Sequence, residues 1–153
     1  MPMTLSSRSF QPQAPIPPAH TCEGADLSPE LAWTDPPAGT KSFALIVNDP
    51  DAPSRNWVHW VLYNLPVATR GLPENVPKTG SLPDQSRQGM NDFRRLGYGG
   101  PCPPSGPAHR YVFTLYAVDR LIELEPGRTK AQLERAIEGH ILARAQLIGT
   151  YQR

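Results

Sequence analysis

The chain has 153 residues, and 15 Lys and Arg against 14 Asp and Glu leave a net charge of +1 at pH 7. This length predicts a single domain, residues 1–153, that can bury roughly 70% of its unfolded surface. The near-neutral charge excludes a nucleic-acid-binding protein that works through a broad basic surface. No segment approaches the roughly 20 apolar residues of a membrane span, so none is expected.

The N-terminal residues and the cysteines indicate in which cellular compartment the protein is expected. Residues 1–10 lack the charged and then apolar pattern of a secretory signal peptide, so we predict a cytoplasmic protein. Two cysteines are too few for a disulfide framework. Cys22 and Cys102 can still pair if their loops are neighbours, although such bonds are rare in a reducing cell.

Most of the predicted elements are strands, because short apolar, β-branched or aromatic runs are bounded by Pro and Gly. In chain order, the expected strands are 3–10, 31–33, 41–48, 57–65, 110–118 and 147–151. The 19 prolines are spread among these runs, which indicates rigid, ordered loops. Residues 66–108 have no regular pattern, and a loop this long inside one domain tends to be functional.

One helix is predicted late in the chain, where Thr129 and Gln132 can form a capping box. Its apolar face would carry Leu133, Ala136, Ile137 and Ile141. Gly139 interrupts this pattern, so we expect a break or two short helices. Mostly strands followed by a helix predict a mainly β fold: an antiparallel β-sandwich with one or two short helices in the C-terminal half.

A rigid turn, Asp-Pro-Asp-Ala-Pro, begins at Asp49. A residue before proline is kept out of the helical region, so both carboxylates stand on a stiff platform. Either a carboxylate points into a pocket, or both aspartates bond local backbone in an Asx turn. We expect Asp49 to face the pocket and Asp51 to hold the turn or a neighbouring strand. Pro50 and Pro53 would be structural, and one X–Pro bond here is a candidate for the cis form.

Two histidines each have an aromatic residue two positions away: Trp57 precedes His59, and Tyr111 follows His109. Side chains two positions apart on a strand share a face, so each pair would make a wall that is partly apolar and partly polar. A lone His is more often a hydrogen-bonded structural residue. Two such pairs, each next to a proline-rich turn, favour one shared binding site.

The segment Gly-Pro-Cys-Pro-Pro-Ser-Gly, residues 100–106, offers a backbone surface for an anion. Glycines let the backbone approach a ligand, and successive N–H groups can form an anion-binding concavity. The available donors would be those of Gly100, Cys102, Ser105 and Gly106. The segment is not a P-loop, because Gly-Lys-Ser/Thr is missing. A purely structural role for the glycines remains the alternative.

Together these motifs resemble the phosphatidylethanolamine-binding protein family, which includes the Raf kinase inhibitor proteins. The matching motifs are Asp49-Pro-Asp-Ala-Pro53, Trp57-x-His59, Gly100-Pro-Cys-Pro-Pro-x-Gly106 and His109-Arg-Tyr111. Flanking segments also match its bacterial and archaeal branch, among them Cys22-x-Gly24, Tyr63-Asn-Leu-Pro66 and Asn91-Asp-Phe93. The resemblance runs from about residue 20 to the end of the chain.

The resemblance implies two packed sheets and one pocket that takes phosphate, acetate or phosphoryl-ethanolamine head groups. The residues expected to bind the ligand are Asp49, Trp57, His59, Gly100, Pro101, Cys102, His109 and Tyr111, with Gly106 as a structural residue of the loop. Imidazolium and phenol groups can donate to phosphate oxygens. A bare Asp49 carboxylate repels an anion, so it is either protonated or bound to the ligand's ammonium. Affinity should therefore rise as the histidines protonate near pH 6.5.

We expect a non-enzymatic binding protein without a cofactor or a metal. The main alternative is a hydrolase with Cys102 as nucleophile, His59 or His109 as base and Asp49 as orienting group. Cys102 lies between prolines, away from any helix N-terminus that would lower its pKa, which weighs against this. A metal site of the two histidines and an Asp lacks a close-spaced ligand pair. The resemblance also suggests a serine protease or a kinase as a protein target, and a homodimer.

Overall fold

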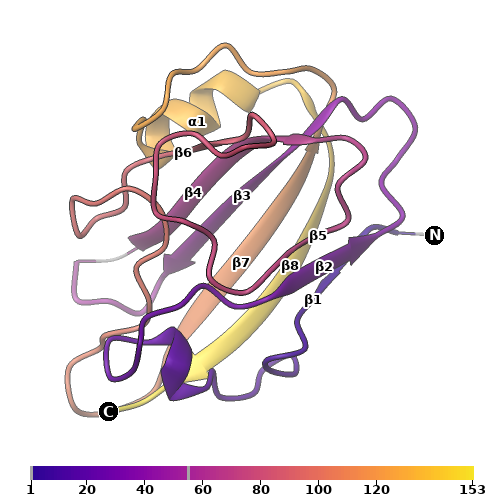
Figure 1. Ribbon diagram of the computed structural model, residues 1–153. Coiled ribbons are helices and arrows are strands. Elements are labelled where there is room, and N and C mark those ends of the chain that lie inside the picture. Colours follow the sequence, from indigo (N-terminus) through magenta and orange to yellow (C-terminus); the bar gives the residue numbers. More distant parts are fainter. Residues whose placement is uncertain (1, 55) are drawn as a thin grey trace.

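Two antiparallel sheets pack against each other in the computed structural model, which describes residues 2–54 and 56–153 (Figure 1). The smaller sheet has the order β1 (Thr4–Ser6), β2 (Leu31–Thr34), β5 (Gly71–Leu72). The larger has the order β6 (Arg87–Gln88), β4 (Trp57–Pro66), β3 (Ser42–Asp49), β7 (His109–Val118), β8 (Ile141–Tyr151). The described residues also form a 3-10 helix, η1 (Pro18–His20), and one α-helix, α1 (Lys130–Ile137). The predicted mainly β fold with antiparallel sheets is confirmed.

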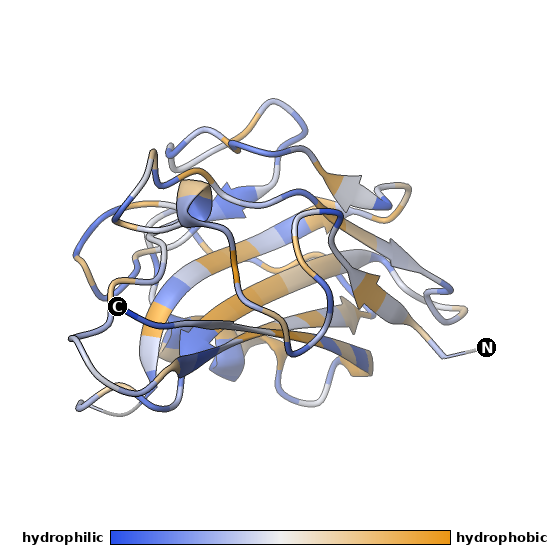
Figure 2. Cartoon of the chain, turned by 90° about the horizontal axis from the view of Figure 1, so that it is seen from below, coloured by the Kyte–Doolittle hydropathy of each residue, from blue (hydrophilic) through white to orange (hydrophobic). Residues whose placement is uncertain are grey.

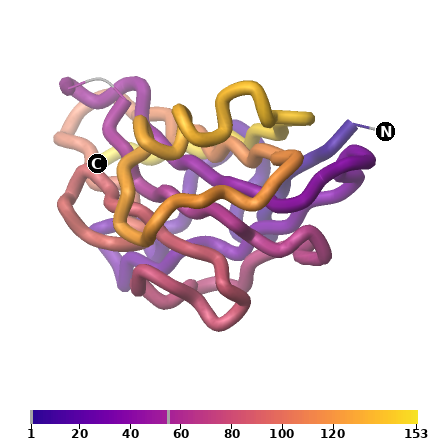
Figure 3. Tube along the Cα trace, turned by 90° about the horizontal axis from the view of Figure 1, so that it is seen from above, coloured from indigo at the N-terminus to yellow at the C-terminus, as the bar shows by residue number. Residues whose placement is uncertain are grey.

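The central strand β3 is buried on both faces, which explains its continuous apolar run. Phe43, Leu45 and Val47 belong to the core between the two sheets. Ala44 and Ile46, on the alternate positions, belong to a second core that includes residues of α1. Figure 2 shows the apolar residues concentrated along the strands. In Figure 3 the gold helix and the orange segment before it lie over the strands of the larger sheet.

The capping box at the start of α1 forms as predicted. The Gln132 backbone N–H donates to the Thr129 hydroxyl, and the Thr129 backbone N–H donates to the Gln132 side chain. The helix ends at Ile137, and Gly139 follows with a left-handed φ of +80°. Glycine adopts this conformation without a steric cost and ends helices in this way.

Several predicted bounds were wrong. Ile141 does not continue the helix but begins β8, which pairs with β7 along its whole length. The strand predicted at 3–10 is shorter in the structure, where only β1 forms, because β1 pairs with the four-residue β2. The stretch 66–108 holds two short strands, β5 and β6. No helix of the described residues is long and apolar enough to cross a membrane.

Candidate functional site

The ends of three neighbouring strands enclose a pocket of about 310 Å³. Asp49 ends β3 and is the register partner of Trp57, which begins β4. His109 begins β7 on the other side of β3. The antiparallel ladder thus brings distant segments to one end of the larger sheet. The pocket is lined by Asp49, Ala52, Pro53, Ser54, Trp57, His59, Phe93, Cys102, Pro103, Pro104, His109 and Tyr111.

Six of the predicted binding residues line this pocket: Asp49, Trp57, His59, Cys102, His109 and Tyr111. The structure places Gly100 and Pro101 outside its lining, which corrects the expected floor. The Gly100 N–H donates to Asp26 Oδ1 at 2.8 Å, on the other side of the loop. Pro101 is buried, and its carbonyl accepts from the backbone N–H of Cys22 at 3.1 Å.

Two of the four backbone N–H donors expected in the loop 100–106 already have hydrogen-bond partners within the protein. The Gly100 N–H is bound to Asp26, and the Gly106 N–H donates to the Arg153 carbonyl at 3.4 Å. Because these two donors already have partners, the loop 100–106 offers an anion less backbone than the sequence predicted. The pocket's polar groups are therefore mainly side chains.

Asp49 combines the two interpretations that the sequence left open. Its Oδ1 accepts from the Asp51 backbone N–H at 2.8 Å, which is an Asx turn. Its Oδ2 accepts from His109 Nδ1 at 2.7 Å, and the residue is only 3% exposed. The turn therefore fixes the carboxylate so that it orients the imidazole of His109.

Both pocket imidazoles are oriented through Nδ1. A carbonyl can only accept, so His59 Nδ1 must donate to the Gly99 carbonyl, 2.6 Å away. His109 Nδ1 likewise donates to the Asp49 carboxylate. Each imidazole then has Nε2 left for another partner, as an acceptor when neutral and as a donor when protonated. Burial lowers the pKa of His59, against the opposing effect of the Gly99 carbonyl.

The Tyr111 hydroxyl is the one buried side-chain polar atom of the described residues without a hydrogen-bond partner. Tyr111 is 1% exposed and lines the pocket. Burial raises the pKa of this phenol most, followed by the charge of Asp49 and a hydrogen-bonding contribution from the same carboxylate, which nevertheless does not reach hydrogen-bond geometry, so the phenol stays a neutral donor. Leaving a buried donor unpaired costs about 1–3 kcal/mol.

Aromatic rings make the apolar part of the wall. Phe93 lies edge-on to Trp57 and to His59, with ring centroids 5.5 and 5.4 Å apart. Phe93 was not among the predicted binding residues, although it is one of the few large apolar side chains that remain exposed. The sequence signals for it were an aromatic residue inside a Gly- and Pro-rich loop and the Asn91-Asp-Phe93 segment that matches the family. These rings narrow the pocket around its polar groups.

Asp51 holds the turn to β7, as expected. Its carboxylate accepts from the Arg110 backbone N–H and from the guanidinium, each at 2.9 Å. The Arg110 side chain is the main reason that the pKa of Asp51 falls to about 2. The described residues contain no cis peptide bond, so the cis candidate in this turn was wrong. Asp51 thus fastens the edge of the pocket without lining it.

A disulfide joins Cys22 to Cys102, an outcome that the sequence left open. It connects the segment after η1 to the pocket loop across 80 positions. Because its Sγ is bonded, Cys102 has no thiol in this state, and the hydrolase alternative lacks its nucleophile. No group of three or more His, Cys, Asp or Glu within residues 2–54 and 56–153 is arranged to hold a metal ion.

Fold and pocket define a β-sandwich protein with a ligand-sized cavity at its strand ends. A sequence model described as phosphatidylethanolamine-binding protein matches residues 6–152. The chain belongs to the phosphatidylethanolamine-binding protein family, and this membership supports a binding-protein function.

Relatives and solved structures agree with this membership. The UPF0098 protein of Methanothermobacter thermautotrophicus is 52% identical over 151 residues, which cover 99% of each chain. That of Aquifex aeolicus is 48% identical, covering 99% of this chain and 89% of that protein. The crystal structure of the homologue CT736 from Chlamydia trachomatis has a TM-score of 0.90 and 41% identity, covering 99% of this chain and 98% of that chain. That of E. coli YbcL, described as a new member of the mammalian PEBP family, has a TM-score of 0.93 and 32% identity, covering 100% and 99%.

Proposed function

We propose that the strand-end pocket binds a small anionic group, a phosphoryl or carboxylate head group, without catalysing a reaction. The observation that carries the proposal is the Tyr111 hydroxyl, a buried donor that no described residue satisfies. Two imidazoles with oriented rings line the same cavity. Charge-assisted hydrogen bonds from imidazolium to phosphate oxygens are stronger than neutral ones.

The charge balance of the pocket requires protons for anion binding. With neutral imidazoles, Asp49 is the only charge among the lining side chains, and it repels an anion. Protonation of His109 would neutralise that charge within the Asp49–His109 pair, and protonation of His59 would make the pocket positive. Phosphate binding should therefore take up protons, and affinity should rise as the pH falls.

A zwitterionic head group can offset the negative charge of Asp49 without protonation of the pocket. The ammonium of phosphoethanolamine can approach the Asp49 carboxylate while its phosphoryl group accepts from Tyr111 and the imidazoles. Trp57 and Phe93 offer ring faces that also favour a cation. We therefore expect phosphoethanolamine to bind more tightly than inorganic phosphate at pH 8, because its ammonium offsets the Asp49 charge without the uptake of a proton.

The test is an NMR titration of the ¹⁵N-labelled chain with inorganic phosphate and with phosphoethanolamine, at pH 8 and pH 5.5. Phosphate should shift the amides of His109 and Tyr111, with higher affinity at pH 5.5. His59→Gln should lower phosphate affinity at pH 5.5 about tenfold, because bound phosphate favours the protonated imidazole that burial disfavours in the free protein. Equal affinity at both pH values, or in both proteins, would contradict the proposal.

Regulation of a serine protease or a kinase, a homodimer and a cytoplasmic location stay predictions. Family membership is the only support for a protein target. Inhibition assays against serine proteases and kinases test it without affecting the pocket proposal. The disulfide weighs against the cytoplasm, because such bonds are rare in reducing compartments. Thiol labelling of the chain in intact cells would show whether the bond is formed there.

A further inference from the structure

A second cavity of about 240 Å³ lies behind the wall of the strand-end pocket. The two cavities share Phe93 and Cys102 in their linings. The second is lined by Cys22, Asp26, Lys78, Asn91, Phe93, Arg95, Tyr98, Gly99, Gly100 and Cys102. We refer to it as the loop cavity, because loop segments of the long irregular stretch and of the N-terminal region form it.

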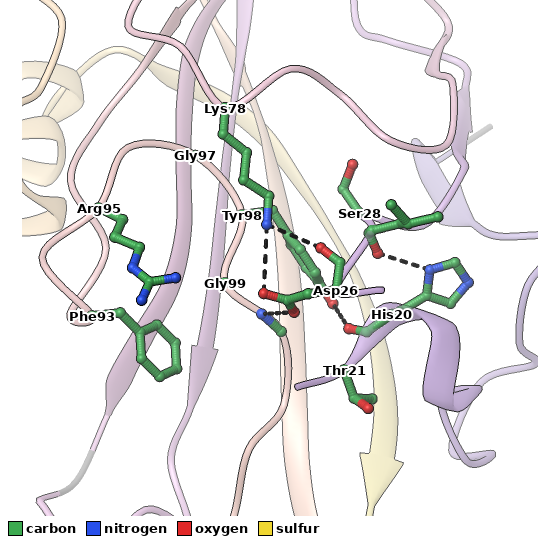
Figure 4. Close-up of polar contacts among 12 residues, drawn as sticks. His20, Thr21, Asp26, Ser28, Lys78, Phe93, Arg95, Gly97, Tyr98 and Gly99 are labelled. Carbon is green, nitrogen blue, oxygen red and sulfur yellow. Dashed lines mark hydrogen bonds and ion pairs between the residues drawn. The ribbon is translucent and has the colours of Figure 1, made fainter. Parts of the chain in front are cut away.

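Two cations from different loops face the loop cavity. In Figure 4, Arg95 and Phe93 lie on one side of Gly99, while Lys78 approaches from above toward Asp26. Lys78 and Arg95 against the single carboxylate of Asp26 leave a formal charge of +1 in the lining. The strand-end pocket has the opposite balance while its imidazoles are neutral.

The carboxylate of Asp26 is already engaged, so it opposes an incoming anion less than a bare one. Its Oδ1 accepts from the Gly100 backbone N–H at 2.8 Å, and its Oδ2 lies 3.5 Å from Lys78 Nζ. Lys78 Nζ also donates to the Asp26 backbone carbonyl at 3.0 Å. An ammonium carries three donors, so one donor of Lys78 remains for a ligand.

Arg95 is held by its backbone while its guanidinium stays without an ion-pair partner. The Asn91 side-chain oxygen accepts from the Arg95 backbone N–H at 3.2 Å, and the Arg95 carbonyl accepts from the Asn91 N–H at 2.9 Å. Lys78 pairs with Asp26, but no ion pair among the described residues includes Arg95. A guanidinium can bind phosphate through two parallel hydrogen bonds, and it keeps its charge at any working pH.

We propose that the loop cavity is a second anion site, which binds a phosphate dianion between Arg95 and Lys78. The proposal is independent of the function proposed for the strand-end pocket, because the donors are different residues. It also differs in its chemistry. Arg and Lys stay charged between pH 5.5 and pH 8, so pH acts here mainly through the ligand. Phosphate takes up its second proton in this range, and the affinity for the dianion should fall as the pH drops. Both side chains are exposed, so binding should weaken as salt screens their charges.

The test is a titration of the ¹⁵N-labelled full chain with inorganic phosphate at pH 8 and constant ionic strength. The amides of Lys78 and Arg95 report on the loop cavity, and those of His109 and Tyr111 report on the strand-end pocket. Arg95→Gln and Lys78→Gln should each weaken the loop-cavity response about tenfold. Arg94→Gln is the matched control, because Arg94 is the adjacent arginine of the same turn and does not line the cavity.

The outcomes separate the two sites. Tyr111→Phe should leave the loop-cavity response unchanged, and Arg95→Gln should leave the strand-end response unchanged. No phosphate response at Lys78 and Arg95 would overturn the proposal. Equal weakening by Arg94→Gln and Arg95→Gln would also overturn it, because that result would reflect only the surface charge of the turn. A control spectrum of each variant confirms that it is folded.

Discussion

The strand-end pocket and the loop cavity share a wall but differ in how they hold charge. In the first, Asp49 and His109 are buried against each other at the ends of paired strands. In the second, Lys78 and Arg95 are exposed side chains on loops, next to one backbone-bound carboxylate. Burial shifts the pKa of a titratable group, so the charge of the first site depends on pH. Exposed cations stay charged, and salt screens their interaction with a ligand. Lower pH should therefore strengthen phosphate binding in the strand-end pocket and weaken it in the loop cavity, where the dianion is the ligand, and salt should weaken binding mainly in the loop cavity.

The disulfide lies where the two sites meet, so removing it should have the largest effect. Closing a loop of about 80 residues in the unfolded chain corresponds to about 4.5 kcal/mol in the chain-entropy account, and measured losses for native disulfides are about 2–5 kcal/mol. We expect Cys22→Ser combined with Cys102→Ser to lower the free energy of unfolding by about that amount. Urea unfolding measures this loss.

The same variant should affect the two sites unequally. Amide hydrogen exchange should rise more in the segment around Cys22, which borders the loop cavity, than at the start of β7. Reduction of the wild-type chain with dithiothreitol is the matched control for the double substitution. An unchanged unfolding free energy would show that the bond contributes nothing to the fold.

Substitution of the Asp49 carboxylate should change the phosphate affinity of the strand-end pocket about tenfold. Asp49→Asn keeps an oxygen for the Asp51 N–H, presents its NH2 group to His109 Nδ1, which must then accept, and removes the negative charge that repels phosphate. We expect inorganic phosphate to bind about tenfold more tightly at pH 8. The preference for phosphoethanolamine should disappear.

Calorimetric titration of both ligands measures the two effects of Asp49→Asn. The response of the amides of Lys78 and Arg95 to phosphate should stay as in the wild type, which sharpens the contrast between the sites. Weaker phosphate binding by this variant would mean that the carboxylate helps to hold the anion, contrary to the charge balance described above.

The smallest expected effect is a dependence of stability on pH through His59. Burial lowers the pKa of His59 below its ordinary 6.5, so the unfolded chain takes up a proton where the folded chain does not. The free energy of unfolding should therefore fall as the pH drops below about 6.5. The lowered pKa of Asp51, about 2 against 3.8, acts only below about pH 4 and does not overlap.

Urea unfolding at pH 7.5, 6.5 and 5.5 measures this effect in phosphate-free buffer. His59→Gln should show a smaller loss between pH 6.5 and pH 5.5 than the wild type. The same pH dependence in both proteins would assign it to other groups.

The strand bounds could be predicted where the composition alone favours a strand. They were wrong where pairing with a neighbouring strand decides the bounds. β3, β4 and β7 are mostly apolar or aromatic, and their predicted bounds agree with the structure within one residue. β8 begins six residues earlier than predicted, since its first half has no strong strand signal of its own and is ordered by β7. The helix start followed from local capping chemistry, which depends only on residues three positions apart.

The pocket residues on strands could be expected from sequence, but the loop residues could not be placed. Strand alternation predicts that His59 shares a face with Trp57, and Tyr111 with His109, and all four line the pocket. The direction of the Gly100 N–H depends on its hydrogen bond to Asp26, which is 74 positions away in the sequence. The loop cavity could not be predicted for the same reason, since Lys78 and Arg95 come to line one cavity only in the folded chain.

The most direct test of the strand-end site is Tyr111→Phe, measured for both stability and phosphate affinity. Removing a buried hydroxyl that has no partner should raise the free energy of unfolding by about 1 kcal/mol. The same change should weaken phosphate binding about tenfold, because the ligand loses that donor. A gain in stability together with a loss of affinity is the result that we predict. Unchanged affinity would show that the hydroxyl does not face the ligand, and it would contradict the account of this pocket.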